Sequence, residues 1–369
     1  MLPFSCYAIV APGLEAITAR ELEALGLVPD VTEAGGVEFQ ATREQLYAAN
    51  LRLRTASRIV VRIARFHART FFELERHAAR VPWAEFMAPG AAVAFHVTSR
   101  KSKLYHHGAI EERLARAATG RGSEPGGPSA LFVVRVLRDQ VTISADSSGE
   151  LLHRRGYRQA TAKAPLRETL AAAMLLASGW DGVAPLVDPF AGSGTIPIEA
   201  ALIARRIAPG LHRRFAFEHW PGFDAAAWER VRARAASEVV AAAPGPIIGA
   251  DRDAGAIRAA TGNAERAGVS ADVEWRRAPL STLAPPRGRG WLITNPPYGV
   301  RVGERRRLDE LYAELGAIAR ERLGGWTLAL LSASGALEAR TGLALSVAWH
   351  TTNGGIPVRL MTGTVPEPG

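Results

Sequence analysis

The stretch from residue 185 to residue 207 constrains the fold most, because an apolar run passes through a glycine turn directly into a helical pattern. The apolar residues 185–187 lead into the motif Asp188-Pro189-Phe190-Ala191-Gly192-Ser193-Gly194-Thr195. Glycine adopts positive φ without strain, and proline is tolerated in the first turn of the helix predicted over residues 196–207. From residue 168 onward, predicted strands and helices alternate in the same way. This alternation predicts a mostly parallel, doubly wound α/β sheet.

The glycine turn also predicts a cofactor site. Without Cβ atoms at Gly192 and Gly194, a nucleoside cofactor can approach the backbone closely. A phosphate-binding loop would need Lys followed by Ser or Thr after the last glycine, and Thr195-Ile196 does not fit that pattern. A dinucleotide cofactor stays open on the glycines alone.

A second candidate for cofactor binding closes the next apolar run, at Asp251. An acidic residue at the end of the second strand of such a sheet commonly accepts hydrogen bonds from ribose hydroxyls. The alternative is a turn residue that caps the helix predicted over residues 254–267. The candidate cofactor-binding residues are Asp188, Phe190, Ala191, Gly192, Ser193, Gly194, Thr195, Asp251, Arg252 and Asn295.

The motif Asn295-Pro296-Pro297-Tyr298 follows the apolar run of residues 291–294. The side-chain oxygen of Asn295 and the carbonyl of Pro296 can accept the N–H hydrogens of an amino group and turn its lone pair towards a methyl donor. Tyr298 offers a ring face on which an extruded base can stack. Four residues alone fit equally well a strand that ends in a Pro-Pro turn under an aromatic lid. Both motifs, in this order, favour transfer of a methyl group from S-adenosylmethionine to an amino nitrogen.

Composition indicates a globular chain with an anionic partner. The 369 residues suffice for two or three domains, and 47% hydrophobic with 22% charged residues is ordinary for a globular protein. A net charge of +9 favours a polyanion. The single cysteine, Cys6, excludes a disulfide framework and a four-cysteine zinc site. The lack of a disulfide framework predicts a cytoplasmic location. No apolar run reaches about 18 residues, so we expect no membrane span.

The pattern divides the chain into four stretches, of which the third is the most basic. Residues 151–170 carry five basic residues and one acidic residue. Residues 208–227 are expected as an irregular insertion over the edge of the C-terminal sheet, and Asn353-Gly354-Gly355 as the turn of a closing hairpin. The predicted domains are an α+β unit at 1–60 in which Thr42 caps a helix, a second α/β module at 61–150, a basic joint at 151–167 and the doubly wound domain at 168–369.

Basic residues also gather in the second module. Arg100, Lys101 and Lys103 stand between a predicted strand and a predicted helix, where they could contact phosphates. A solvated surface is the alternative. The neighbouring His106 and His107 have no third ligand at a useful spacing, so no metal site is expected.

These residues together resemble a known family, the RNA guanine-N2 methyltransferases that carry a THUMP domain, over nearly the whole chain. The similarity is greatest to the N-terminal methyltransferase of the bacterial 23S rRNA enzymes, and the members that modify the acceptor stem of tRNA are the alternative. Glutamine-directed protein methyltransferases share Asn295 to Tyr298 but are not expected to carry this N-terminal half. The resemblance is carried by Asn50-Leu51-Arg52-Leu53-Arg54-Thr55-Ala56, residues 99–107, Leu152-His153-Arg154-Arg155-Gly156-Tyr157-Arg158, Ala164-Pro165-Leu166-Arg167-Glu168-Thr169 and Asn295-Pro296-Pro297-Tyr298-Gly299-Val300-Arg301.

The resemblance implies a Rossmann-like, seven-stranded class I methyltransferase domain preceded by N-terminal α+β modules, one ferredoxin-like and one THUMP. It implies S-adenosylmethionine as the cofactor, structured RNA as the partner, the N2 amino group of a guanosine as the methyl acceptor, and neither metal nor membrane. The implied catalytic residues are Asn295, Pro296, Pro297 and Tyr298. The implied RNA-binding residues are Arg100, Lys101, Lys103, Arg154, Arg155, Arg158 and Arg301.

One position departs from the family pattern. Where the family usually places an acidic residue that contacts the adenine amino group, this chain has Ala278. We therefore expect weaker cofactor binding or a backbone carbonyl in place of the carboxylate. The departure also motivates a hypothesis from a different class, a non-catalytic RNA-binding assembly factor with a vestigial cofactor site.

Overall fold

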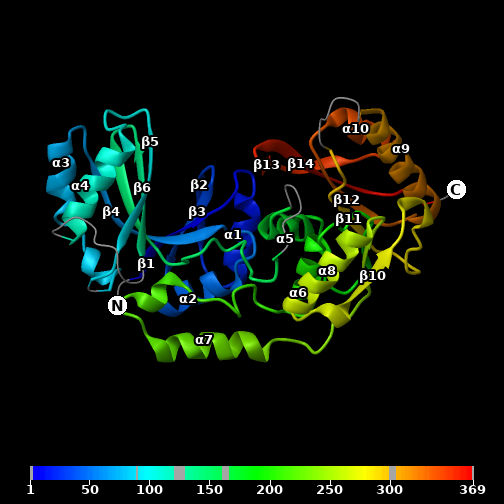
Figure 1. The fold of residues 1–369 in the computed structure, drawn as a ribbon, viewed down its shortest axis with the longest axis horizontal. Helices are drawn as coiled ribbons and strands as arrows, with labels where there is room; N and C mark the ends of the chain where they lie inside the picture. The colour runs from blue at the N-terminus through cyan, green and yellow to red at the C-terminus, as the bar shows by residue number, and fades with distance from the viewer. Residues whose placement is uncertain (1–2, 89, 120–128, 160–165, 299–304, 368–369) are drawn as a thin grey trace. The chain divides into compact units, whose positions relative to one another are not determined.

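The computed structural model describes residues 3–88, 90–119, 129–159, 166–298 and 305–367 (Figure 1). By its internal contacts the chain forms two compact units. The N-terminal unit comprises Met1–Val10, Ala19–Leu152 and Arg213–Ala233, and the C-terminal unit comprises Ala11–Thr18, His153–His212 and Arg234–Gly369. None of the described helices is both long enough and apolar enough to cross a membrane.

The N-terminal unit is built on one sheet of seven described strands, in the order β2-β3-β1-β4-β7-β6-β5. Neighbouring strands are antiparallel except β5 and β6, which run parallel. The central strand β4 pairs with β1 on one side and with β7 on the other, so the strands expected in two modules form one sheet. The strands are β1 (Phe4–Ile9), β2 (Pro29–Glu33), β3 (Gly36–Ala41), β4 (Arg58–His67), β5 (Val93–Arg100), β6 (Ala130–Leu137) and β7 (Gln140–Asp146).

Helices of this unit begin where the sequence supplies capping residues. The Thr42 hydroxyl accepts from the Gln45 N–H over 3.3 Å, and the Gln45 side chain accepts from the Thr42 N–H over 2.9 Å. Thr70 and Glu73 form the same reciprocal pair. The cap predicted at Thr42 is therefore confirmed. The helices that lie wholly or partly in this unit are α1 (Glu15–Ala24), α2 (Arg43–Arg52), α3 (Phe71–Ala78), α4 (His107–Thr119) and α7 (Ala225–Ser237).

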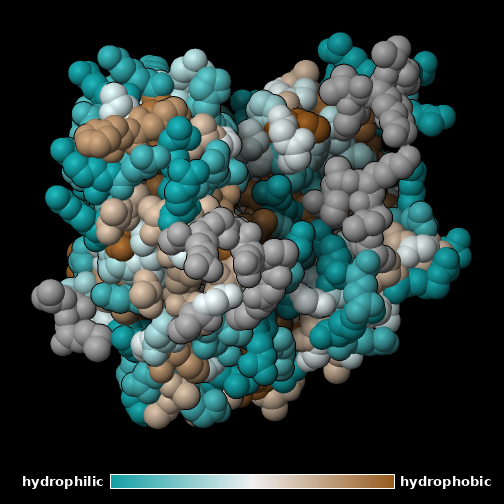
Figure 2. All heavy atoms as spheres, turned by 60° about the vertical axis from the view of Figure 1, so that its left-hand side comes forward, coloured by the Kyte–Doolittle hydropathy of each residue, from teal (hydrophilic) through white to brown (hydrophobic). Residues whose placement is uncertain are grey.

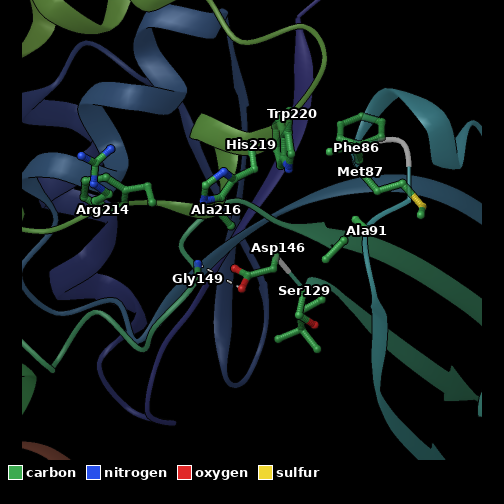
Figure 3. Close-up of a pocket in the computed structure, with 14 residues that line it drawn as sticks. Phe86, Met87, Ala91, Ser129, Asp146, Gly149, Arg214, Ala216, His219 and Trp220 are labelled. Atoms are coloured by element: carbon green, nitrogen blue, oxygen red, sulfur yellow. Dashed lines mark hydrogen bonds between the residues drawn. The ribbon is translucent and has the colours of Figure 1, made fainter. Parts of the chain in front are cut away.

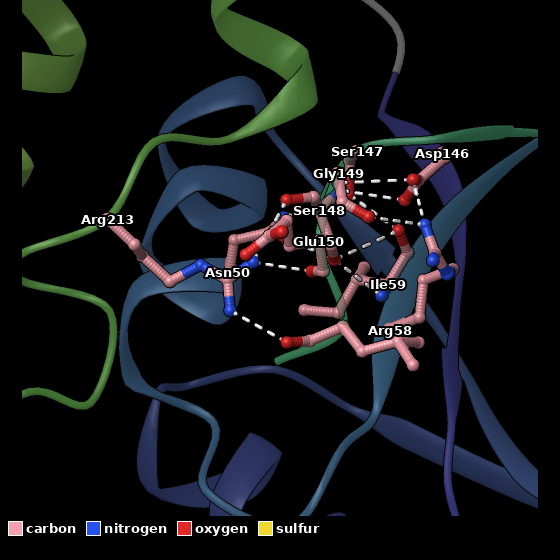
Figure 4. A network of polar contacts seen from close by, with 10 residues as sticks. Asn50, Arg58, Ile59, Asp146, Ser147, Ser148, Gly149, Glu150 and Arg213 are labelled. Carbon is pink, nitrogen blue, oxygen red and sulfur yellow. Dashed lines mark hydrogen bonds and ion pairs between the residues drawn. The ribbon is translucent and has the colours of Figure 1, made fainter. Parts of the chain in front are cut away.

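A buried polar network joins α2 to the adjoining ends of β4 and β7 (Figure 4). Asn50 Nδ2 donates to Ser147 Oγ over 2.9 Å, and Ser148 Oγ donates to Asn50 Oδ1 over 2.7 Å. Arg58 forms an ion pair with Asp146, and burial raises the pKa of that carboxyl to about 6. Because buried polar groups are costly unless they are paired, the network stabilises the register at the place where the two expected modules meet.

Residues 213–233 differ from the expectation of an insertion over the C-terminal sheet, because they belong to the N-terminal unit. The Phe217 ring stacks on the Tyr47 ring with 4.3 Å between centroids, and the Asp224 N–H donates to the Tyr47 hydroxyl over 3.1 Å. Trp228 packs edge-on against Phe217 at 5.2 Å. Large aromatic side chains contribute strongly to burial, so this cluster decides where the segment packs.

The C-terminal unit confirms the predicted doubly wound α/β fold. Its sheet has seven described strands in the order β10-β9-β8-β11-β12-β14-β13. The first five are mutually parallel, and β14 runs antiparallel to both of its neighbours, β12 and β13. The strands are β8 (Leu186–Asp188), β9 (Ile247–Asp251), β10 (Val273–Arg277), β11 (Trp291–Thr294), β12 (Thr327–Ser332), β13 (Ser346–Asn353) and β14 (Ile356–Thr364). The helices are α5 (Glu168–Ala177), α6 (Thr195–Ala204), α8 (Ala254–Arg266), α9 (Arg305–Arg322) and α10 (Gly335–Arg340).

Two hydrophobic cores cover the two faces of this sheet. Ile293 belongs to the core that includes residues of α5, α6 and α8, whereas its neighbour Leu292 belongs to the core of α9 and α10. Successive strand residues point to opposite faces, and a parallel sheet buried on both sides therefore reads as a continuous apolar run. This explains why the runs before Asp188 and Asn295 are apolar without alternation.

Candidate active site

The two sequence motifs meet at the carboxyl ends of neighbouring strands. Strands β8 and β11 pair in parallel, with Val187 opposite Leu292, so Asp188 and Thr294 end the two strands side by side. The Thr294 hydroxyl donates to Asp188 Oδ1 over 2.6 Å. The carboxyl ends of parallel strands are where ligands bind in such sheets. The fold therefore places the glycine loop and the Asn295 loop at one site.

Asn295 carries an unsatisfied acceptor at this site. Its Oδ1 is almost completely shielded from solvent and has no hydrogen-bond partner within the part of the chain that the structure describes. Of the two prolines that follow, Pro296 is buried and Pro297 is exposed. A buried polar atom without a partner costs free energy, and such atoms in a native fold call for a functional explanation. An incoming N–H donor would satisfy Asn295.

Tyr298 is held at both its ring and its hydroxyl. The half-buried ring packs against both hydrophobic cores of the C-terminal unit. Its hydroxyl accepts a hydrogen bond from Asn353 Nδ2 over 2.8 Å. Burial raises the pKa of the Tyr298 phenol above its ordinary value of 10.0. Asn353 was expected only as a turn residue, and no local pattern marks its contact with a residue 55 positions away.

The two glycines of the upstream loop serve different purposes. Both have positive φ, of 53° at Gly192 and 83° at Gly194. A Cβ at Gly192 would meet no atom within 4 Å, so the space beside it is open to a ligand. A Cβ at Gly194 would lie 2.6 Å from the Trp275 ring and 2.9 Å from Ala260 Cβ. Gly194 therefore allows α6 to pack closely, which corrects the expectation that both glycines clear a path for the cofactor.

The two acidic residues of the cofactor site also differ. Asp188 is 1% exposed and accepts from the Phe190 N–H over 3.1 Å in addition to Thr294. Burial raises the pKa of Asp188 to about 7. Asp188, at the end of β8, therefore holds the start of the glycine loop through the Phe190 N–H. Asp251 is half-buried, and its Oδ2 accepts from the Gly192 N–H over 3.0 Å.

A carboxylate can accept about four hydrogen bonds, so Asp251 keeps capacity for ribose hydroxyls beside Gly192. The capping role belongs instead to Asp253, which accepts from the Gly255 N–H over 2.6 Å at the start of α8. Arg252 is exposed next to them. The Ala278 N–H donates to the Asp251 carbonyl over 3.0 Å, which sets the backbone of Ala278 beside the end of β9. Phe190 and Ala191 lie in the same loop, where the Ala191 N–H donates to the Ala250 carbonyl over 2.9 Å.

A support below the glycine loop was missed in the sequence. Asn263 Nδ2 donates to the Ser193 carbonyl over 2.9 Å, and Arg158 donates to Thr195 Oγ1 over 2.9 Å. Asn263 is fully buried on α8. A buried polar residue within a helical pattern was the signal that could have pointed to it.

Two of the arginines expected to bind RNA lie inside the C-terminal unit. Arg155 is 8% exposed and forms an ion pair with the fully buried Glu199 over 3.5 Å. Arg158 pairs with the buried Glu168 over 3.3 Å. Buried acids demand a cationic partner, and this demand takes both guanidinium groups away from the surface. These contacts correct the expectation that both arginines bind RNA: Arg155 pairs with Glu199 inside the unit, and Arg158 pairs with Glu168 and donates to Thr195 Oγ1. Arg154 is exposed, and Arg301 lies outside the described residues.

Arg100, Lys101 and Lys103 are exposed on the N-terminal unit, at the end of β5 and in the loop before α4. Asp139, in the turn between β6 and β7, orders this loop by accepting from the Lys103 N–H over 2.7 Å and from Arg69 over 3.0 Å. The face shown in Figure 2 is largely hydrophilic, with smaller hydrophobic areas between the polar side chains. The loop is therefore suited to contact an anionic partner in solvent.

The N-terminal unit also contains a pocket of about 240 Å³, which has no part in the predicted site (Figure 3). Phe86 and Trp220 line it, with 5.0 Å between ring centroids, together with His219 and Asp146. The Asp146 carboxylate accepts from the Gly149 N–H over 3.1 Å as well as pairing with Arg58. The Asp146 carboxylate is thus already bonded within the fold. Among the described residues, no group of three His, Cys, Asp or Glu side chains is arranged to hold a metal.

A doubly wound sheet with a glycine loop and Asn-Pro-Pro-Tyr at neighbouring strand ends defines the class of methyltransferase domains. Residues 155–361 match the RMKL-like methyltransferase domain, and residues 5–60 match the RlmL ferredoxin-like domain. The chain belongs to the RMKL-like methyltransferase family.

Individual relatives agree with this assignment. A putative RNA methyltransferase of Synechocystis sp. is 34% identical over 96% of this chain and 95% of its own length. The ribosomal RNA large subunit methyltransferase K/L of Syntrophotalea carbinolica is 37% identical over 99% of this chain, which spans only 54% of that protein. The crystal structure of SMU.472, a putative methyltransferase complexed with SAH, matches with a TM-score of 0.92 at 32% identity over 100% of both chains.

Proposed function

We propose that this chain transfers the methyl group of S-adenosylmethionine to the exocyclic N2 amino group of a guanosine in large-subunit ribosomal RNA. The observation that carries the proposal is the shielded, unpaired Oδ1 of Asn295 at the end of β11, beside the glycine loop. The names of the Synechocystis and Syntrophotalea relatives support RNA, and in the second case ribosomal RNA, as the substrate.

The residues of the glycine loop fit S-adenosylmethionine. The open space beside Gly192 admits a nucleoside, and the Asp251 carboxylate next to it is placed to accept from ribose hydroxyls. When bound, this cofactor supplies an electrophilic methyl group. Where the family has an acidic residue towards adenine, we propose that the backbone carbonyl of Ala278 accepts instead; the Ala278 N–H, bonded to the Asp251 carbonyl, keeps this backbone beside β9. Relatives of the same fold include a methyltransferase complexed with SAH.

The Asn295 loop acts on the amino group. An amino group on a nucleobase is a weak nucleophile because its lone pair is delocalised into the ring. Asn295 Oδ1 and the Pro296 carbonyl accept its two N–H hydrogens and fix the lone pair towards the methyl donor. Tyr298 provides the ring against which the extruded base stacks. The nitrogen releases its proton after the methyl group has moved, so the mechanism needs no strong base.

The N-terminal unit delivers the RNA. A pocket that reads one base cannot by itself select a site in a long RNA, so shape and phosphate contacts outside the pocket must contribute. Residues 61–150 are proposed as the THUMP module. Arg100, Lys101 and Lys103 in that module, and the exposed Arg154, are the proposed phosphate contacts.

The test is a methylation assay on ribosomal RNA and tRNA from a strain that lacks the gene, followed by nucleoside mass spectrometry. We expect N2-methylguanosine in ribosomal RNA. The substitution Asn295→Ala should lower turnover roughly a hundredfold or more, because the acceptor geometry is lost. Calorimetry should show an unchanged affinity for S-adenosylmethionine. Arg289→Ala, an exposed change before the other end of β11, is the control and should leave turnover normal.

Other outcomes decide between the alternatives. Near-normal turnover of the Asn295→Ala protein would reject the role of this loop. Methylation of tRNA alone would favour the tRNA alternative. An absence of S-adenosylmethionine binding at millimolar cofactor would favour the non-catalytic assembly factor that Ala278 motivates.

A further inference from the structure

Asn353 contacts the Asn295 loop from a distant part of the sheet. It is the last residue of β13 and is 8% exposed. Its Nδ2 donates to the Tyr298 hydroxyl over 2.8 Å. The hydroxyl is therefore the acceptor in this bond, and its own hydrogen remains available to a further partner.

The strand pattern explains why Asn353 points inward. Trp349, Thr351 and Asn353 are buried, whereas His350 and Thr352 between them are exposed. This is the alternation of a strand with one buried face. The turn that follows has two glycines with φ of 59° and 85°, which lets the chain reverse directly after Asn353.

The hairpin also belongs to the same sheet as β11, the strand that ends just before Asn295. Strand β13 pairs with β14, β14 pairs with β12, and β12 pairs with β11 through Thr294 opposite Leu330. A hydrogen bond from this hairpin therefore relates Tyr298 to the same sheet that sets the position of Asn295. A ring packed against two hydrophobic cores can still tilt about its bonds, and a fixed hydroxyl removes that freedom.

We infer that Asn353 is a positioning residue for methyl transfer: through the Tyr298 hydroxyl it holds the ring in the orientation that receives the extruded base. The inference rests on the proposed function and goes beyond it, because it assigns a role in catalysis to the closing hairpin. Asn353 acts on the substrate only through Tyr298.

The experiment is a double-mutant cycle with Asn353→Ala, Tyr298→Phe and both changes together. Each single change should lower kcat by roughly three- to tenfold, the effect of losing one hydrogen bond. The double variant should be no slower than the slower single variant, because both remove the same bond. KM for S-adenosylmethionine should stay within about twofold in all three, since no contact to that pocket changes. Thr352→Ala, on the exposed side of the same strand, should have normal kcat and Tm.

The outcomes separate this inference from the proposed function. Additive losses in the cycle, or a normal kcat for Asn353→Ala with unchanged Tm, would overturn it. If Asn353→Ala does not fold, Tyr298→Phe tests the same bond with the ring retained, and a normal kcat for that variant would overturn the inference. A wild-type protein that transfers no methyl group to RNA would instead reject the proposed function.

Discussion

At the scale of single residues, chemically similar side chains at neighbouring strand ends have opposite environments. Asp188 is buried, bonded to Thr294 and Phe190, and carries a pKa raised to about 7. Asn295, one residue past the end of the next strand, has a shielded oxygen with no partner in the described residues. The first arrangement stabilises the loop and the second costs free energy that substrate binding can recover. A side chain whose hydrogen bonds are all made within the fold, such as Asp188, supports the site, whereas one with an unpaired acceptor, such as Asn295, is available to a ligand.

The raised pKa of Asp188 predicts a pH dependence of stability. Its folded pKa lies above its ordinary value of 3.8, so the folded chain binds this proton more tightly than the unfolded chain. The stabilisation is fully present below pH 3.8 and is lost as the pH rises to about 7. Asp188→Asn, which keeps an accepting oxygen, should reduce the fall in stability over this range, by up to a few kcal/mol. Denaturant titrations of both proteins from pH 4 to 8 measure it.

The comparison with the wild type removes effects of other groups. Burial lowers the pKa of His153 to about 4, which makes stability rise with pH below its ordinary value of 6.5. That contribution is common to both proteins. Asp181, whose pKa is lowered by the N–H groups of Ala184 and Val183, is the contrasting control. Its contribution to stability is present above pH 3.8 and is lost only as the pH falls below that value, so Asp181→Asn should leave the slope of stability between pH 4 and 8 unchanged. An equal slope for the Asp188→Asn and wild-type proteins would contradict the assignment.

At the scale of elements, the loop between β8 and α6 is stabilised from several directions. Asn263 on α8 and Arg158 from the joint hold its end, and Asp251 from β9 holds its middle. The basic joint therefore has a structural function in the C-terminal unit. Two of its arginines pair with buried acids, Arg155 with Glu199 and Arg158 with Glu168.

Substitutions at the two glycines should separate packing from ligand binding. Gly194→Ala places a Cβ against Trp275 and Ala260 at positive φ, and should cost about 1–3 kcal/mol of stability or more. Gly192→Ala meets open space and should cost only about 1 kcal/mol, for its positive φ. S-adenosylmethionine affinity should nevertheless fall in the Gly192→Ala protein. Thermal unfolding and calorimetry of both variants measure these effects. Equal stabilities, or unchanged cofactor affinity of the Gly192→Ala protein, would contradict this division.

At the scale of the whole molecule, the residues proposed for methyl transfer and those proposed for RNA binding lie in different units. The motifs for methyl transfer lie wholly in the C-terminal unit, and the ordered basic loop of Arg100, Lys101 and Lys103 lies in the N-terminal unit. Changes in one unit should therefore leave the binding properties of the other intact.

Replacing Arg100, Lys101 and Lys103 by alanine should weaken RNA binding and flatten its salt dependence. Each phosphate contact releases counterions when the RNA binds. The loss of these contacts should therefore reduce the slope of log affinity against log salt concentration by up to about three phosphate equivalents. S-adenosylmethionine affinity should be unaffected. The measurement is RNA affinity over a salt series. A matched variant that loses Arg76, Arg80 and Arg116, exposed on or beside α3 and α4, controls for net charge. An equal slope in the wild type and in the variant that lacks Arg100, Lys101 and Lys103 would identify this loop as a solvated surface.

The sequence by itself determined those features that depend on neighbours along the chain. Thr42 and Gln45 predicted a capping box, and the glycine turn after an apolar run predicted the strand, loop and helix from β8 to α6. The alternation of strands and helices determined the α/β class, and the order of the two motifs predicted a methyl-transfer site that includes Asp188 and Asn295. Each of these follows from local backbone preferences or from the geometry of parallel strands.

Only the tertiary structure decided which distant segments meet. It assigned residues 213–233 to the N-terminal unit, because Phe217 in this segment stacks on Tyr47 of α2. It turned Arg155 and Arg158 from expected RNA contacts into partners of buried glutamates. It also brought Asn353 to Tyr298 across 55 residues. A buried charge or amide takes whichever partner the packed chain sets beside it, and that partner has no signature in the local sequence.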